Sequence, residues 1–148
     1  MHRRSTFAVG ACLALAALGG CSRSMTTSDA DVQRLEYEQL VELVQEEGDV
    51  VLVDVRRPAV YADVHLPEAI NLPLSAMRPG LERLAEADTI VVYGEDPFDS
   101  LVLAGAKRLI ALGYEDVRAF SGGMADWQRL GGPTTRTLGP QQDRPERR

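Results

Sequence analysis

Residues 50–55 read Val-Val-Leu-Val-Asp-Val, and residues 89–93 read Thr-Ile-Val-Val-Tyr. Both segments are short apolar runs rich in β-branched residues, and neither alternates with polar residues as a half-exposed strand would. Such runs are typical of strands that are buried on both faces of a sheet, which favours parallel pairing. We therefore expect both segments to be strands at the centre of a buried sheet.

Helical and strand-like patterns alternate on either side of these two runs. This alternation favours an α/β fold: a single domain with a mostly parallel central sheet and helices on both faces. Sites in such sheets form at the carboxyl ends of the strands, here residues 54–56, 93–95 and 120–122. Further strands are expected at residues 69–72 and 117–120, and helices at residues 35–44, 81–87, 100–112 and 122–130.

The N-terminus has the features of a secretory leader. Arg3 and Arg4 precede an apolar run over residues 7–18, which has the length of a signal-peptide core and is short for a membrane span. The run leads into Leu-Gly-Gly-Cys at residues 18–21, which resembles the lipobox of bacterial lipoproteins. This resemblance implies cleavage before Cys21 and attachment of acyl chains, palmitate among them, to that cysteine. Plain secretion and a retained anchor remain as alternatives.

The same resemblance predicts where the protein resides and how its chain is divided. A lipid on Cys21 would anchor the protein to a membrane of the bacterial cell envelope. Ser22 follows the cysteine instead of Asp, which favours the outer membrane, with the domain facing the periplasm. We expect a signal peptide at residues 1–20, a lipidated cysteine with a flexible tether at 21–32, a folded domain at 33–133 and a disordered tail at 134–148.

Charge and cysteine content exclude several functions. The chain has 148 residues and a formal net charge of −6, and loss of Arg3 and Arg4 with the leader makes the charge −8. Such a surface repels phosphate backbones, so we expect no nucleic-acid partner. The only cysteines, Cys12 and Cys21, precede the predicted domain, which excludes a disulfide framework or a cysteine metal site within it. No pattern indicates a cofactor.

Several motifs together resemble the rhodanese-like domain family over about residues 33–133. They are Asp-Val-Arg at 54–56, Tyr61, His-Leu-Pro at 65–67, Ala-Ile-Asn at 69–71, Pro-Leu at 73–74, Leu-Gly-Tyr at 112–114, Val117, Gly-Gly-Met at 122–124 and Trp127. The resemblance implies the fold already expected. It also implies a sulfurtransferase chemistry in which a cysteine, directly after the strand at 89–93, carries sulfur as a persulfide on a loop of backbone N–H groups.

This sequence departs from the family at that cysteine. The loop at residues 94–100 reads Gly-Glu-Asp-Pro-Phe-Asp-Ser, and Gly94 stands where the cysteine is expected. Glu95, Asp96 and Asp99 would also repel an anionic sulfur donor. Both departures predict a domain that is not an enzyme. Residual sulfurtransferase activity is the alternative that the fold alone suggests.

The loop residues have several interpretations. Asp96 or Asp99 could accept backbone N–H bonds and cap the helix that begins near Ser100. Together with Glu95, these two side chains could instead bind a divalent cation. Alternatively, Pro97 and Phe98 belong to a loop that contacts a partner, with Phe98 as an exposed apolar contact. We assign no metal, and we predict a binding module with an envelope protein as its partner.

Outside the loop, Arg56 is the remaining candidate for ligand binding. Its guanidinium could bind a ligand carboxylate, or it could form a structural ion pair with Asp54. His65 is the only histidine of the mature chain and is expected to be structural. We expect Trp127 and Tyr114 in the core. No nucleophile motif surrounds Ser121.

Overall fold

The computed structural model describes residues 28–46 and 48–137. The predicted leader, the predicted lipidation site Cys21 and the last eleven residues lie outside this range. Among the described residues no helix is both long and apolar enough to cross a membrane.

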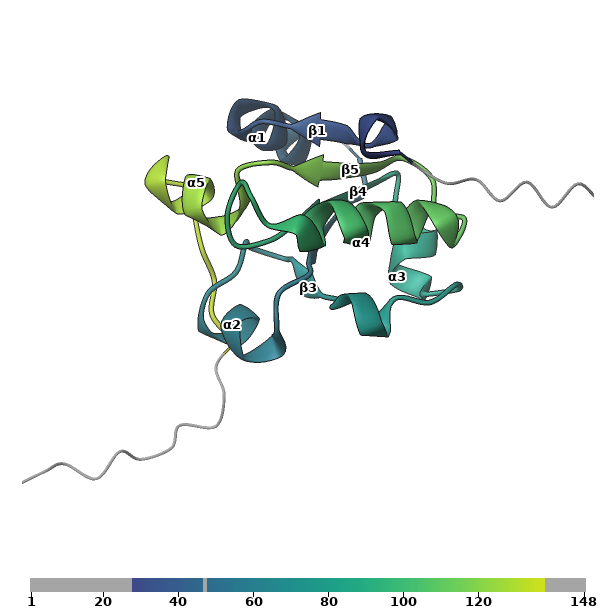
Figure 1. Cartoon of the computed structure of the whole chain (residues 1–148). Helices are drawn as coiled ribbons and strands as arrows, with labels where there is room; N and C mark the ends of the chain where they lie inside the picture. Colours follow the sequence, from purple (N-terminus) through teal and green to yellow (C-terminus); the bar gives the residue numbers. More distant parts are fainter. Residues whose placement is uncertain (1–27, 47, 138–148) are drawn as a thin grey trace, which may run out of the picture.

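Five strands form a single sheet in the order β1-β5-β4-β2-β3, and every pair is parallel (Figure 1). The expected α/β fold is therefore confirmed. In chain order the elements are η1 (Asp29–Asp31), β1 (Gln33–Leu35), α1 (Tyr37–Gln45), β2 (Val50–Asp54), α2 (Pro58–Asp63), β3 (Ile70–Asn71), η2 (Leu74–Ala76), α3 (Glu82–Ala85), β4 (Thr89–Tyr93), α4 (Ser100–Ala111), β5 (Val117–Phe120) and α5 (Gly123–Arg129).

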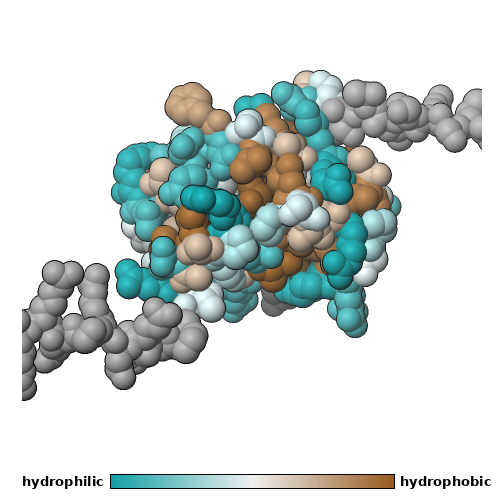
Figure 2. All heavy atoms as spheres, turned by 60° about the horizontal axis from the view of Figure 1, so that its bottom comes forward, coloured by the Kyte–Doolittle hydropathy of each residue, from teal (hydrophilic) through white to brown (hydrophobic). Residues whose placement is uncertain are grey.

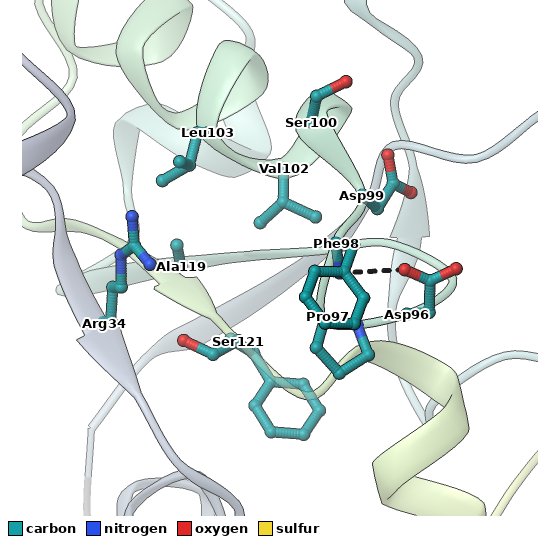
Figure 3. Close-up of a pocket in the computed structure, with 11 residues that line it drawn as sticks. Arg34, Asp96, Pro97, Phe98, Asp99, Ser100, Val102, Leu103, Ala119 and Ser121 are labelled. Atoms are coloured by element: carbon teal, nitrogen blue, oxygen red, sulfur yellow. Dashed lines mark hydrogen bonds between the residues drawn. The ribbon is translucent and has the colours of Figure 1, made fainter.

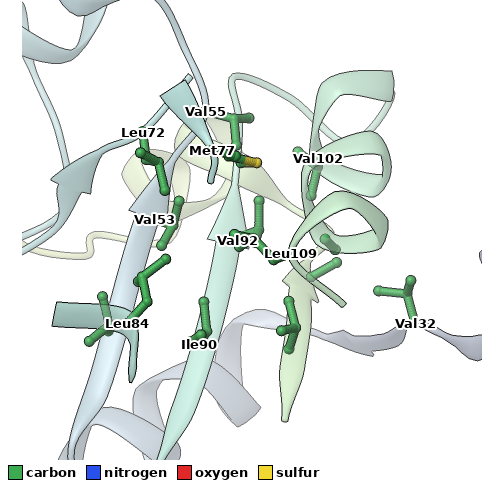
Figure 4. Packing of buried hydrophobic residues seen from close by; sticks show 14 residues of the cluster. Val32, Val53, Val55, Leu72, Met77, Leu84, Ile90, Val92, Val102 and Leu109 are labelled. Carbon is green, nitrogen blue, oxygen red and sulfur yellow. The ribbon is translucent and has the colours of Figure 1, made fainter. Parts of the chain in front are cut away.

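The central strands are buried on both faces, as their composition predicts. In β4, Ile90 and Val92 belong to one hydrophobic cluster, with α3 and α4, and Val91 and Tyr93 belong to another, with α1 and α5. Figure 4 shows the first cluster between the sheet and α4. The described residues thus supply a complete core, and Figure 2 shows a polar surface interrupted by patches of apolar side chains.

One predicted helix begins later in the structure than expected, and one helix was not predicted. Leu35 belongs to the edge strand β1, paired with Phe120 of β5, and not to the first helix. The helix α1 begins after Glu36, whose backbone N–H donates to the Gln39 side chain at 2.9 Å. The helix α2 was not predicted. It begins with Pro58, which suits the first turn of a helix because the N–H groups of that turn have no partner within the helix and proline has no N–H to lose.

The C-terminal boundary of the domain was predicted too early. Thr135 exchanges both backbone hydrogen bonds with His65, each at 2.9 Å. The backbone N–H of Thr137 donates to the carbonyl of Ala62 at 3.1 Å. Residues 134–137 are therefore attached to the domain beside α2, and the part of the predicted tail beyond them lies outside the described residues.

Candidate functional site

The carboxyl ends of three strands meet at one edge of the sheet, as predicted. Arg56 follows β2, and Glu95 follows β4. The Arg56 Nη1 atom donates to the Glu95 carboxylate at 2.8 Å. The backbone N–H of Met124 in α5, which follows β5, donates to the Gly94 carbonyl at 3.0 Å. The loop between β4 and α4 is thus held from both sides.

Asp99 caps the helix that follows this loop. Its Oδ1 accepts the Leu101 N–H at 2.9 Å, and its Oδ2 accepts the Glu95 N–H at 3.1 Å. The Asp96 carboxylate accepts the Phe98 N–H at 2.8 Å. The capping interpretation is confirmed for Asp99, and two carboxylates accept hydrogen bonds from three N–H groups of the loop and of the first turn of α4.

Gly94 is buried against the same carboxylate. A Cβ atom built on Gly94 would overlap with the Asp99 carboxylate oxygen and would lie 2.8 Å from the Val102 Cγ2 atom. Gly94 does not have a positive φ, so its backbone conformation is open to any residue. Space, and not conformation, therefore requires glycine here. The position where the family resemblance expects a thiol has no room for a side chain while Asp99 caps α4.

Arg56 forms the ion pair that was one of its two interpretations. Its Nη2 atom lies 2.7 Å from Asp54 Oδ2 and also donates to the Val64 carbonyl at 2.7 Å, and both members of the pair are buried. Burial by itself lowers the pKa of Arg56, but the hydrogen bonds to Asp54 and Glu95 outweigh it and raise the pKa. The guanidinium also lies over the Tyr93 ring, 5.9 Å from its centroid. Most of the Arg56 guanidinium N–H groups therefore donate to other groups of this domain and are not free for a ligand.

Phe98 is the most exposed large apolar side chain of the described residues, at 93%. It borders a hollow of about 230 Å³ between the loop, the start of α4 and the sheet. Figure 3 shows Arg34 and Ser121 across this hollow from Phe98, while the Asp96 and Asp99 carboxylates turn away from it. The exposed ring is therefore presented on a loop that three hydrogen-bonded carboxylates hold in place.

The carboxylates of the loop do not form a metal cluster. Among the described residues, no group of three or more His, Cys, Asp or Glu side chains is placed to hold a metal ion. Glu95 is turned toward Arg56, with its side chain 58% exposed. The three acids thus have separate partners, and the geometry gives no support to a divalent-cation site.

The other residues singled out from the sequence have structural contacts. His65 is buried, its Nδ1 lies 2.8 Å from the Tyr61 carbonyl, and its ring stacks on Tyr61 at 3.9 Å. Trp127 packs in the core and donates from Nε1 to the Pro133 carbonyl at 2.7 Å. The half-buried Tyr114 accepts a hydrogen bond from the N–H of Leu81.

Gly123 is a site residue whose role sequence reasoning missed. Its φ is +57°, and a Cβ atom there would lie 2.9 Å from the Asp96 backbone nitrogen and from the Gly94 carbonyl oxygen. Only glycine allows α5 to approach the loop this closely. The Gly122-Gly123 pair was a signal of close backbone approach at this position.

Comparison with known proteins agrees with this architecture. The family model described as rhodanese-like domain matches residues 36–130. The chain is 32% identical over 94 residues to an uncharacterized protein of Synechocystis sp., covering 64% of this chain and 51% of that one. It is 28% identical over 123 residues to thiosulfate:glutathione sulfurtransferase of Saccharomyces cerevisiae, covering 75% of this chain and 88% of that one.

A solved structure has a similar fold. The BH2092 protein from Bacillus halodurans superimposes with a TM-score of 0.64 at 25% identity, covering 72% of this chain and 79% of that chain. The chain spans about half the length of the Synechocystis relative, so the match concerns a domain and not that whole protein. The chain belongs to the rhodanese-like domain family.

Proposed function

We propose that this protein is a non-catalytic rhodanese-like domain, anchored by a lipid on Cys21 in the bacterial cell envelope, that binds a protein partner through the loop at residues 94–100. The observation that supports it most is the contact between Gly94 and Asp99. The carboxylate lies where a nucleophilic side chain would have to begin. Residues 28–137 contain no cysteine that could act in its place.

The electrostatics of the loop also oppose sulfur transfer. A persulfide or thiosulfate is an anion and needs free N–H donors. The N–H groups of Glu95, Phe98 and Leu101 already donate to carboxylates of the loop itself. A further negative charge about 6 Å from a carboxylate meets a repulsion of roughly 3 kcal/mol at an effective dielectric constant near 20, before solvent screening. An anionic sulfur donor would therefore meet three occupied N–H groups and the negative charge of the loop carboxylates.

The place where the N-terminal segment joins the domain suits an anchored binding module. Asp29 of η1 forms an exposed ion pair with Lys107 at 2.6 Å, so the N-terminal end of the described chain lies beside the far half of α4. Lys107 lies eight residues beyond Asp99, about 12 Å along the helix. A flexible tether from Cys21 would therefore join the domain away from the Phe98 loop and leave that loop free for a partner.

The anchor is tested by mass spectrometry of the mature N-terminus. We expect a chain that begins at Cys21 and carries acyl groups, and we expect Cys21→Ser to release the protein from the membrane fraction. A chain that begins elsewhere, or a Cys21→Ser protein that stays bound, would remove the anchor from the proposal.

The binding surface is tested with a photo-crosslinking amino acid at position 98 of the lipidated protein in its own cells. The matched control places the same group at Glu115, an exposed residue after α4 at the other end of the sheet. We expect one discrete crosslinked product from position 98 that is absent from position 115 and that disappears with Asp99→Ala, which frees the loop. Equal crosslinking from both positions would argue against a loop interface.

A further inference from the structure

A second hollow lies on the opposite face of the sheet from α4. Its volume is about 400 Å³, within the range of sites for small ligands. None of the residues around it borders the hollow beside Phe98. Its walls are apolar side chains from α1, β2 and the end of α5, including Val41, Leu52 and Trp127. It is thus a separate site, and it does not depend on the proposed function of the loop.

Two aromatic rings line this hollow. The rings of Tyr37 and Trp127 lie 5.3 Å apart between centroids, tilted by 56°. The indole N–H is already bound to the Pro133 carbonyl, and Trp127 is only 5% exposed, so it contributes ring atoms to the wall of the hollow, while the half-buried Tyr37 ring is the more accessible of the two. Aromatic faces of this kind attract organic cations because the face of the ring is electron-rich.

Glu68 is the only charged side chain that lines the hollow. Its φ is +59°, in the left-handed region that favours glycine. Among the described residues, the exposed Glu68 side chain makes no ion pair and no side-chain hydrogen bond. The positive φ belongs to the turn at residues 66–69, in which the Ala69 N–H donates to the Leu66 carbonyl at 3.2 Å and Pro67 and Glu68 take the two central positions. This turn places the Glu68 carboxylate at the hollow.

We infer that this hollow binds a small organic amine, with its apolar body against Tyr37, Val41 and Trp127 and its ammonium group beside Glu68. Charge complementarity selects this occupant, since the hollow offers a carboxylate and aromatic faces and no cationic side chain. A neutral apolar molecule would leave Glu68 without a role, and an anion would be repelled by it.

Trp127 is the only tryptophan of the chain and reports directly on the hollow. The experiment titrates the protein of residues 22–148, which keeps every described element, with cyclohexylmethylamine and with cyclohexylmethanol, its neutral counterpart. Tryptophan fluorescence measures binding, and saturation-transfer NMR of the ligand provides a second readout. We expect the amine to bind about fivefold more tightly than the alcohol, and the difference to shrink with added salt.

Glu68→Gln keeps the size of the side chain and removes its charge, so it should abolish the preference for the amine. Glu82→Gln, an exposed acid on α3, is the matched control and should leave the preference unchanged. Glu68→Gly should abolish the preference and raise the melting temperature, because it relieves the strain. Equal binding of amine and alcohol, a preference that survives Glu68→Gln, or no binding by either readout would each overturn the inference.

Discussion

Replacing Gly94 by alanine tests the packing of the loop. The new methyl group must displace the Asp99 carboxylate, which then loses its hydrogen bonds to the N–H groups of Leu101 and Glu95. Loss of a helix N-cap costs about 1 kcal/mol. The second hydrogen bond contributes about 1 kcal/mol, and crowding against Val102 adds about 1 kcal/mol. We expect Gly94→Ala to lower the free energy of unfolding by about 3 kcal/mol.

A double-mutant cycle separates this contact from a general loss of stability. Asp99→Ala removes both hydrogen bonds and should cost about 2 kcal/mol. The double variant loses the same two bonds only once, so it should cost about 3 kcal/mol instead of the additive 5 kcal/mol, a coupling of about 2 kcal/mol. Urea unfolding followed by Trp127 fluorescence measures each free energy.

Gly48→Ala is the matched control for the cycle. A Cβ atom at Gly48 would have its nearest heavy atom, Asp88 Oδ2, 3.8 Å away, an ordinary contact. This variant should change the free energy of unfolding by less than about 1 kcal/mol. A harmless Gly94→Ala, or costs that simply add in the double variant, would refute the claim that the Asp99 carboxylate fills the space at Gly94.

Three further predictions concern the surroundings of the loop. Arg56→Ala leaves the buried Asp54 carboxylate without its cation and should cost about 3–5 kcal/mol in urea unfolding. Burial raises the pKa of Tyr93, so the stability that depends on its neutral form is complete below pH about 10 and is lost as the pH rises further. Tyr93→Phe should therefore flatten the alkaline decline in melting temperature, and it should cost about 1 kcal/mol at neutral pH because the Leu66 N–H loses its acceptor. Phe98→Ala should leave stability within about 0.5 kcal/mol and abolish the crosslinked product, because the exposed ring contributes little to the fold.

Each of these predictions has a result that would contradict it. A cost below about 1 kcal/mol for Arg56→Ala would mean that Asp54 finds another partner or takes up a proton. An alkaline decline unchanged by Tyr93→Phe would assign the effect to other groups, of which Tyr61, whose pKa is also raised by burial, is the first candidate. A strongly destabilised Phe98→Ala would show that the ring packs against the domain.

The fold was predictable where burial leaves a local pattern. The continuous apolar runs of β2 and β4 are buried on both faces, and the structure places both at the centre of the sheet. Leu35 was assigned to a helix because its spacing to Leu40 and Leu43 fits a helical period, while its actual partner, Phe120, is remote in sequence. A three-residue edge strand carries too little pattern to outweigh that period.

The candidate site was predictable in its chemistry but not in its geometry. The absence of a thiol at Gly94 is read directly from the sequence, which also predicted that Asp96 or Asp99 could cap the next helix, and the structure identifies Asp99 as the cap. The overlap between the two positions does not, because it depends on how the loop folds back onto α4. The positive φ of Glu68 had one signal in the sequence, the preceding Pro67, which favours a turn of this kind, although glycine is the residue that usually takes the third position.

The proposal that this domain does not transfer sulfur is tested most directly by measuring turnover. The protein of residues 22–148, which contains no cysteine, is supplied with thiosulfate and with either cyanide or glutathione as the acceptor. The Saccharomyces sulfurtransferase, assayed in parallel, is the positive control for thiosulfate and glutathione. We predict product formation no faster than in the reaction without protein. Sustained turnover that scales with the concentration of this domain would contradict the account, because it would require a nucleophile and an anion site that the loop at Gly94 does not provide.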